Sequence, residues 1–236
     1  MTAFALNPDI RIQLRRIGHE AQPLLVVDNV LADPQAMIVA AQGAGFYVPS
    51  HTHYPGLNAP LPDAYYQTVV TGLRGAIEAA FGLPRDAWIK FFGFFALATT
   101  PAHQALPIQK IPHYDSLDTG RLAMVHYLCR GDFGGTGFFR HKATGFESVD
   151  AGREARYVAA ASAQIEPAPG SLTDYASDGM AHYDLAGQAE AVFDRLILYR
   201  THVLHSALLK GAVLSPDPAA GRLTANGFIE VTQAPE

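Results

Sequence analysis

Trp88–Ala98, with the sequence WIKFFGFFALA, decides the fold, because the character of the chain changes at this point. Its aromatic and apolar residues predict one long β-strand. Farther along the chain, Gly134 and Gly135 mark a turn between more apolar segments. Those segments predict further strands at 109–115, 122–129, 136–140, 195–199 and 223–231. This part of the chain therefore predicts a mainly β core.

The residues before this strand predict helices that support the core. Residues 24–27 form a short apolar strand, and the following Asp33-Pro34 pair is typical of a helix start. That helix is expected to end near Gln42. A longer helix is predicted over 63–81, where apolar residues recur at helical spacing, with Gly82 as its terminator. Two helices followed by many short strands favour a β-sandwich or barrel.

We expect a single domain over residues 1–236. Within it, residues 1–87 supply helical support and loops, and residues 88–236 form the β core with an irregular insertion near 144–194. Long irregular segments in compact domains are often functional. The predicted loop at 51–62 and the insertion are therefore candidate lids over a site.

The composition indicates a folded chain with no signature of nucleic-acid binding. Hydrophobic residues make up 49% of the 236 residues and charged residues 17%, which suffices for a sizeable core. The net charge is −5, and no basic run predicts a nucleic-acid partner. The lone Cys129 excludes an intrachain disulfide and is expected to be buried. No signal peptide and no apolar run of about 20 residues is present, so we expect a cytoplasmic protein without a membrane partner. A homodimer is left open.

The triplet His113-Tyr114-Asp115 is a candidate metal site. Residues two apart on a strand point to the same face, so His113 and Asp115 are expected to share one face. A third ligand must come from another strand, and His205, which follows the predicted strand 195–199, is preferred. Two imidazoles and one carboxylate can bind one face of a ferrous ion and leave the other face open, as in non-heme Fe(II) oxygenases.

The other histidines are expected to have different roles. His202 is three residues before His205 and is expected to point to the opposite face. His126 lies within an apolar run and predicts a core histidine with satisfied hydrogen bonds. Surface positions are expected for the four histidines in polar or loop segments, which are His51, His53, His141 and His182.

Arg222-Leu223-Thr224 repeats the two-residue spacing, so its two polar side chains also share a face. A guanidinium can hold a carboxylate through two parallel hydrogen bonds, and a hydroxyl can add a third. Taken alone, the segment is typical of an exposed strand edge. The order of ligand pair, glycine turn, distal His and Arg-x-Thr favours instead a site for the far carboxylate of a 2-oxoacid cosubstrate.

This order resembles the 2-oxoglutarate- and Fe(II)-dependent dioxygenases, specifically their prolyl-4-hydroxylase-like branch, and is similar to a bacterial group of such proteins. The family has an H-x-D strand, a strand resembling hYLN, a GGE/T turn, an LHxV segment and a closing R-x-S/T. The matching pieces here are His113-Tyr114-Asp115, Val125–Leu128, Asp132–Thr136, Leu204–Ala207 and Arg222-Leu223-Thr224. The resemblance spans roughly residues 91–231.

The resemblance implies a fold and an iron site. The implied fold is a double-stranded β-helix, or jelly roll, with helices backing one sheet. His113, Asp115 and His205 would ligate Fe(II). An Asp at position 115, where related halogenases have a small residue, implies hydroxylation chemistry. The separation between His113 and His205 is longer than is usual in the family. This departure affects how loops cover the site and not the identity of the ligands.

The resemblance also implies a cosubstrate and a reaction. Arg222 and Thr224 would bind the C5 carboxylate of 2-oxoglutarate, and the hydroxyl of Tyr127 matches a position that can reach it. Oxidative decarboxylation with molecular oxygen would give succinate and hydroxylate an unknown substrate.

Three other functions stay open from the sequence. A cupin-type metal protein would use the same three ligands and have no role for Arg222. A non-catalytic β-sandwich binding module would carry its His and Asp residues incidentally. A zinc hydrolase would share the ligands but give Arg222 and Thr224 no function.

Overall fold

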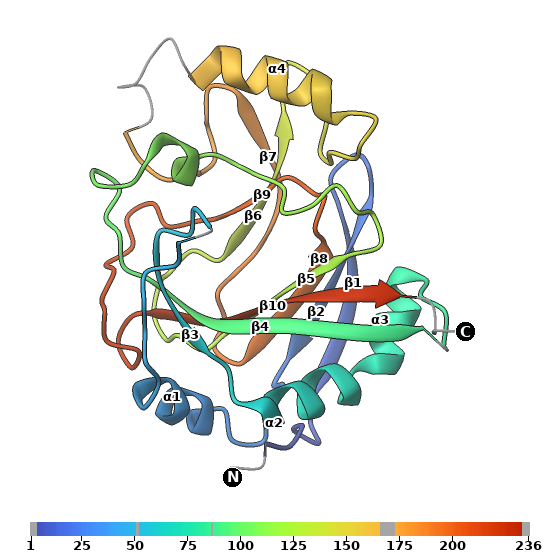
Figure 1. Cartoon of the computed structure of the whole chain (residues 1–236), viewed down its shortest axis with the longest axis vertical. Coiled ribbons are helices and arrows are strands. Elements are labelled where there is room, and N and C mark those ends of the chain that lie inside the picture. The colour runs from blue at the N-terminus through green and yellow to red at the C-terminus, as the bar shows by residue number, and fades with distance from the viewer. Residues whose placement is uncertain (1–3, 51, 86, 166–172, 233–236) are drawn as a thin grey trace.

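The computed structural model describes residues 4–50, 52–85, 87–165 and 173–232, which form two antiparallel sheets (Figure 1). The strands are β1 Arg11–Ile17, β2 Gln22–Asp28, β3 Gly56–Pro60, β4 Trp88–Ala98, β5 Leu122–Tyr127, β6 Thr136–His141, β7 Tyr183–Ala189, β8 Arg195–Arg200, β9 His205–Ala207 and β10 Arg222–Thr232. The larger sheet has the order β1-β2-β8-β5-β10-β4-β3, and the smaller sheet has the order β7-β6-β9. The expected mainly β architecture is confirmed.

β10 shows how alternation of side chains divides the molecule into layers. It pairs antiparallel with β4 from Arg222 opposite Ala98 to Thr232 opposite Trp88. Leu223 and Ala225 belong to an apolar core together with helical residues on the outer face of the larger sheet. The alternate residues, beginning with Arg222, point to the opposite face, toward the smaller sheet. One face of β10 therefore packs in the apolar core, and the other face lines the interior between the sheets.

Helices cover the outer faces of both sheets (Figure 1). α1 Gln35–Gln42, α2 Asp63–Tyr66 and α3 Arg74–Phe81 pack on the larger sheet, where Met37, Val69 and Ile77 are buried. α4 Glu154–Ile165 lies beside β7 at the top of the view, and its Tyr157 packs with Phe139 of the smaller sheet. No helix among the described residues is long and apolar enough to cross a membrane.

The predicted helix over 63–81 is interrupted. A π-helical turn, Gln67–Thr71, follows α2, and Leu73 leaves helical geometry before α3 begins. A Cβ at Gly72 would lie 2.7 Å from the side chain of Leu6, so the N-terminal segment packs directly against the break. The predicted end is confirmed, because Gly82 caps α3 in the left-handed conformation with φ 67°.

The predicted strand over 109–115 is wrong. A 3-10 helix, Pro107–Lys110, occupies its start, with proline at the first turn and the Gln109 side chain accepting from the backbone of Leu106. Pro112 carries no backbone N–H, and the only pairing of this segment is an isolated antiparallel bridge between His113 and His205.

Three further differences involve segments whose pattern is weak. Residues 56–60 of the predicted loop form β3 and pair with β4, whereas His51 lies outside the described residues. β1 was not predicted because its sequence RIQLRRI is largely polar, and its side chains are mostly exposed at the sheet edge. The predicted insertion near 144–194 contains α4 and β7, although part of it, 166–172, lies outside the described residues.

The histidines divide between core and surface. His126 is buried, as predicted, and its ring nitrogens are 2.8 Å from the Tyr65 hydroxyl and 3.0 Å from Asp194 Oδ1. His141 is fully buried, so its predicted surface position is wrong. Its two ring nitrogens lie 2.9 Å from Thr144 Oγ1 and from Gln164 Oε1, and these partners allow the ring to be buried.

Candidate metal centre

Three candidate ligands come together between the two sheets: His113, Asp115 and His205. One donor atom from each residue lies within 4.8 Å of the others. Asp115 Oδ1 is 3.7 Å from His113 Nε2, and Asp115 Oδ2 is 3.5 Å from His205 Nε2. The three side chains therefore surround a single point, as ligands of one metal ion must.

Backbone hydrogen bonds fix the positions of these three residues. His113 and His205 exchange both backbone hydrogen bonds, each 2.9 Å long. The N–H of Asp115 donates to the carbonyl of Thr201 at 2.9 Å, which holds the carboxylate beside the start of β9. The shared face that the sequence predicted thus arises from an isolated bridge rather than from a continuous strand.

Hydrogen bonds to the backbone also orient the imidazoles. His205 Nδ1 lies 2.9 Å from the carbonyl oxygen of Val203 and donates to it, so Nε2 is left as the free lone pair. His113 has a hydrogen bond to the backbone of Ile111. Its side chain is 50% exposed, but it faces a cavity rather than the open surface. Desolvation within this cavity, followed by the neighbouring His205, lowers the pKa of His113, which favours the neutral ring that a metal ligand requires.

Arg222 lies in the same cavity at the start of β10 and is only 3% exposed. Its Nη2 donates to the carbonyl of Gly135 at 2.9 Å, whereas its Nε has no partner among the described residues. Gly135 has φ 118°, and a Cβ there would lie 2.1 Å from the carbonyl of Ala189, so the predicted glycine turn requires glycine at this position. The turn brings a backbone acceptor to the guanidinium but leaves part of its charge unpaired.

Tyr54 is a site residue that the sequence did not identify. Its hydroxyl is buried beside Arg222 and Thr224, whose side chains interact with it, but no described residue makes a hydrogen bond of good geometry to it. Burial raises its pKa to about 12, although Arg222 acts in the opposite direction, so the hydroxyl remains a donor at pH 7. The only sequence signal was its position in the segment 51–62, which was a candidate lid.

Thr224 and Tyr127 lie beside Arg222 but not on the cavity surface. Both are fully buried, and they oppose each other in the pairing of β10 with β5. The Thr224 hydroxyl donates to the carbonyl of Ala96 at 3.3 Å, and the Tyr127 and Thr136 hydroxyls are 2.7 Å apart. The Tyr127 ring lies 5.8 Å from the guanidinium carbon of Arg222. The two residues therefore pack behind the guanidinium.

The cavity that holds these groups has a volume of about 500 Å³. The metal-ligand triplet and Arg222 line it, and apolar side chains of β4 and β5 line much of the remainder. Tyr54 and Tyr175, from the two candidate lids, also line it. His202 is buried and does not line the cavity; Arg140 does not line it either and pairs with Asp184 at 3.0 Å.

Comparison with known proteins identifies one family and a shared fold. The model of a "Family of unknown function (DUF6445)" matches residues 8–229, and no curated protein matches the chain. HygX from Streptomyces hygroscopicus, solved with nickel and 2-oxoglutarate bound, is 9% identical, with a TM-score of 0.52 over 89% of this chain and 83% of HygX. The likeness to HygX shows a shared fold, and the predicted double-stranded β-helix is confirmed.

Two other solved structures have lower scores. The non-heme α-ketoglutarate-dependent epimerase SnoN of nogalamycin biosynthesis is 13% identical, with a TM-score of 0.46 over 92% of this chain and 82% of SnoN. An N-substituted L-amino acid dioxygenase from Burkholderia ambifaria is 12% identical, with a TM-score of 0.39 over 100% of this chain and 97% of that protein.

Proposed function

The chain belongs to the family of unknown function DUF6445, and we propose that it is an oxygenase that uses Fe(II) and 2-oxoglutarate to hydroxylate a substrate. The proposal places the chain in the superfamily that the sequence resembles, within its prolyl-4-hydroxylase-like branch. His113, Asp115 and His205 are the proposed iron ligands.

The observation that carries this proposal is the buried Arg222 guanidinium in the cavity of the candidate triplet. Among the described residues it has no acidic partner, and its Nε has no hydrogen-bond partner. A buried cation with a free donor is costly unless an anion completes it. The Tyr54 hydroxyl, beside Arg222, also lacks a well-formed hydrogen bond to any described residue. A dicarboxylate with a keto group satisfies both ends of this cavity, because one end can chelate a metal and the other can accept from Arg222 and Tyr54. A metal protein without a 2-oxoacid gives the free guanidinium no function.

Each proposed residue then has a defined task. The two imidazoles and the Asp115 carboxylate hold Fe(II) on one side and leave the cavity side open. Arg222 and Tyr54 bind the C5 carboxylate, while Thr224 and Tyr127 pack behind the guanidinium and fix its direction. Bound iron and 2-oxoglutarate supply oxygen activation, with decarboxylation of 2-oxoglutarate to succinate. The apolar cavity lining limits the access of water to the reacting centre.

Two measurements on the purified protein test this function. Anaerobic addition of Fe(II) and 2-oxoglutarate should produce the weak visible charge-transfer band of the chelate, and admission of oxygen should produce succinate without added substrate. Asp115→Ala should lose both signals. Asp184→Ala, which removes a carboxylate outside the cavity, should keep both. Absence of the band and of succinate in the wild-type protein would remove the oxygenase from consideration.

A further inference from the structure

The cavity surface changes from charged to apolar along one face of β10, and Asn226 stands at the transition. Arg222, Asn226 and Phe228 all line the cavity, as expected for side chains that share a strand face. Asn226 Oδ1 is buried and has no hydrogen-bond partner among the described residues. An unpaired buried acceptor is unfavourable, and a ligand that donates to it recovers the lost hydrogen bond.

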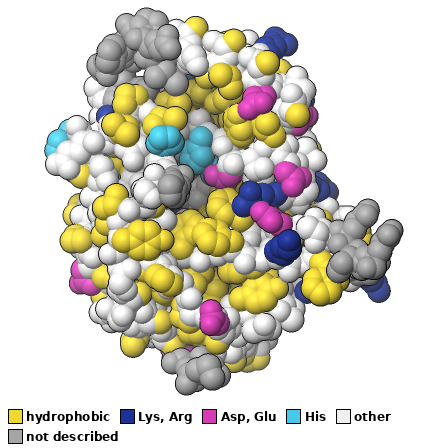
Figure 2. Space-filling view, viewed as in Figure 1, with side chains coloured by type: hydrophobic (Ala, Val, Ile, Leu, Met, Phe, Trp, Pro, Cys, Tyr) yellow, Lys and Arg dark blue, Asp and Glu magenta, His cyan; other side chains and the backbone are white. Residues whose placement is uncertain are grey.

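Aromatic side chains surround Asn226 on the side away from Arg222. In the sheet, Asn226 lies opposite Phe94 of β4, and Phe228 lies opposite Phe92. The ring centroids of Phe92 and Phe94 are 5.8 Å apart, and Phe92 is 65% exposed. Figure 2 shows hydrophobic side chains gathered on the face that carries β4. We call Phe92, Phe94 and Phe228 the aromatic shelf; the Phe92 and Phe94 rings are tilted by 54° to each other, and together the three side chains offer an apolar surface at the cavity.

The charged groups of the cavity are already used by the proposed metal and cosubstrate sites. His113, Asp115 and His205 would hold iron, and Arg222 would hold a carboxylate. Of the other described residues that line the cavity, none is Lys, Arg, Asp or Glu, and His53 is an exposed histidine.

Arg121 is a neighbouring cation that does not line the cavity. Its guanidinium carbon lies 4.8 Å from the Phe228 ring centroid, and it pairs with Glu230 at 3.3 Å. No unpaired charged side chain of the described lining is therefore left for a charged substrate.

We propose that the substrate is an uncharged small molecule with an apolar body and one hydroxyl or N–H group. Its body lies on the aromatic shelf, and its polar group donates to Asn226 Oδ1. This inference rests on the proposed function, because 2-oxoglutarate must occupy the Arg222 end. The cavity volume of about 500 Å³ lies within the range of small-molecule sites.

Three matched probes test this inference by equilibrium dialysis at pH 7. The probes are 2-naphthol, 2-methylnaphthalene and 2-naphthoate, which share one ring system and differ in a hydroxyl, a methyl and a carboxylate. The full-length protein is used with Ni(II) and 2-oxoglutarate present, so that the Arg222 end is filled. We expect 2-naphthol to bind about fivefold to tenfold more tightly than 2-methylnaphthalene, from one hydrogen bond. We expect 2-naphthoate to bind most weakly.

Variants locate the hydrogen bond. Asn226→Leu should abolish the preference for 2-naphthol while retaining 2-methylnaphthalene binding. Asn58→Leu is a matched control, because Asn58 Oδ1 is also buried without a partner but does not line the cavity, and it should keep the preference. Phe92→Asp, at an exposed position of the shelf, should weaken binding of all three probes.

Several results would overturn the inference. Equal wild-type affinities for 2-naphthol and 2-methylnaphthalene, a preference that survives Asn226→Leu, or tightest binding of 2-naphthoate would each contradict it. The wild-type comparison suffices if a variant does not fold. Probe binding does not require turnover, so loss of the charge-transfer band and succinate with intact probe selectivity would remove the oxygenase chemistry alone. Loss of probe selectivity with an intact charge-transfer band and succinate production would contradict only the proposed substrate class.

Discussion

Arg222 is a charged side chain that is held out of solvent with one donor unused. Its replacement distinguishes an oxygenase that uses 2-oxoglutarate from a cupin-type metal protein that does not. Arg222→Met keeps much of the side-chain volume but removes the charge, and we expect 2-oxoglutarate affinity to fall at least tenfold. A hydrogen bond to a charged group contributes about 1.5–3 kcal/mol, and 1.4 kcal/mol is about tenfold in affinity. The affinity of Arg222→Lys for 2-oxoglutarate should lie between those of the wild type and Arg222→Met, because lysine keeps the charge but loses the two-pronged geometry.

The measurement is titration of 2-oxoglutarate into the anaerobic Fe(II) protein, followed by the visible band. Arg140→Met is the matched control, because Arg140 pairs with Asp184 outside the cavity. Unchanged affinity in Arg222→Met would favour the cupin-type metal protein over the oxygenase.

Asp194 ends the long irregular segment and satisfies several buried donors. Its carboxylate accepts from the N–H of Leu31, with both oxygens at 3.2 Å, and it lies 3.0 Å from His126 Nε2. It also has a positive φ of 60°. Asp194→Leu removes the acceptor and favours other backbone geometry, so we expect a loss of about 3–5 kcal/mol in the free energy of unfolding. Asp194→Asn keeps an acceptor and tolerates this φ, so its loss should be clearly smaller. Urea unfolding at pH 7 measures both, and equal losses would contradict this account.

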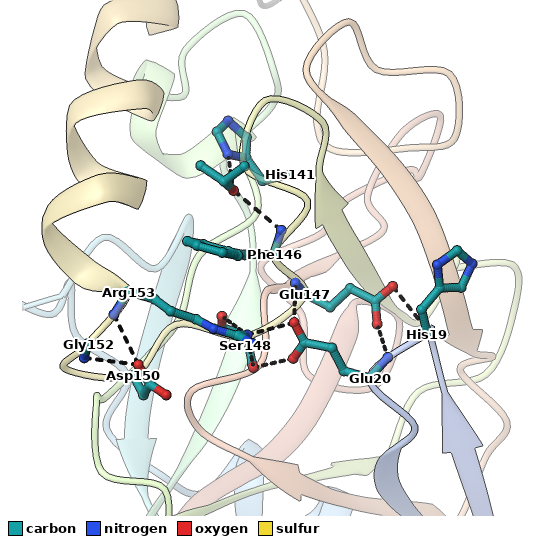
Figure 3. Close-up of polar contacts among 10 residues, drawn as sticks. His19, Glu20, His141, Phe146, Glu147, Ser148, Asp150, Gly152 and Arg153 are labelled. Carbon is teal, nitrogen blue, oxygen red and sulfur yellow. Dashed lines mark hydrogen bonds and ion pairs between the residues drawn. The ribbon is translucent and has the colours of Figure 1, made fainter.

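At the scale of elements, a polar clamp joins the β1–β2 turn to the segment before α4 (Figure 3). The Glu147 carboxylate accepts from the N–H groups of His19 at 3.0 Å and Glu20 at 2.9 Å. In return, the Glu20 carboxylate accepts from the N–H of Glu147 at 3.1 Å, from the Ser148 hydroxyl and from Arg153 Nη1 at 2.6 Å. These reciprocal bonds hold two segments that are far apart in sequence.

Removal of one carboxylate should loosen this clamp. We expect Glu20→Ala to lower the free energy of unfolding by about 2 kcal/mol, because it leaves three donors without their acceptor. Glu190→Ala removes an exposed partner of Arg195 and should change stability by less than about 0.5 kcal/mol. Urea unfolding of both variants at pH 7 is the measurement. Similar small changes in both would show that solvent replaces the Glu20 contacts.

The clamp should also weaken in acid. Burial raises the pKa of Glu20, but hydrogen bonds from Ser148, the Glu147 backbone and Arg153 outweigh it and lower the pKa below 4.5. A carboxyl with a lowered folded-state pKa stabilises the protein fully above its unfolded pKa and loses that effect as the pH falls through the folded value. The stability difference between wild type and Glu20→Gln should therefore be constant above about pH 5 and shrink below pH 4.5. A difference that grows on acidification would contradict the sign.

Strands that are long apolar runs could be predicted from the sequence. Segments whose structure depends on pairing with another strand could not. β4 has the predicted bounds, and β10 begins one residue earlier than predicted, because both are long apolar runs. β1 was missed because its outer-edge position leaves its side chains exposed. The order of motifs along the sequence grouped His113, Asp115, His205 and Arg222, and the fold brings these residues to one cavity; their roles stay a prediction. Tyr54 and Asn226 were not identified in this way, because their relevance depends on which polar atoms lack partners after packing.

At the scale of the whole molecule, the candidate site joins the two sheets. His205 lies on β9 of the smaller sheet, Arg222 lies on β10 of the larger sheet, and Asp115 lies in the segment that precedes β5. Residues that are distant in sequence therefore converge only in the folded chain. A ligand that bridges them binds the folded state and not the unfolded chain, so its binding free energy adds to stability.

This arrangement predicts that metal and 2-oxoglutarate together stabilise the protein by more than the sum of their separate effects. At a ligand concentration of 100 times Kd the added stability is about 2.7 kcal/mol. One kcal/mol raises Tm by about 2–4 °C in a chain of this size. We expect Ni(II) to raise Tm, 2-oxoglutarate alone to change it little, and both together to raise it by more than the sum, because the bound metal supplies one end of the cosubstrate site. Chelation of the metal should remove both gains.

Thermal unfolding of three proteins under four conditions checks this coupling. The conditions are no ligand, Ni(II), 2-oxoglutarate and both. Asp115→Ala should lose the metal and the cosubstrate effects, whereas Arg222→Met should keep the Ni(II) shift and lose the additional shift from 2-oxoglutarate. If 2-oxoglutarate instead raises Tm equally with and without metal, its site is separate from the triplet. The cavity would then bind an anion at Arg222 without presenting it to the metal, and the oxygenase geometry would be wrong even though each half of the site binds its ligand.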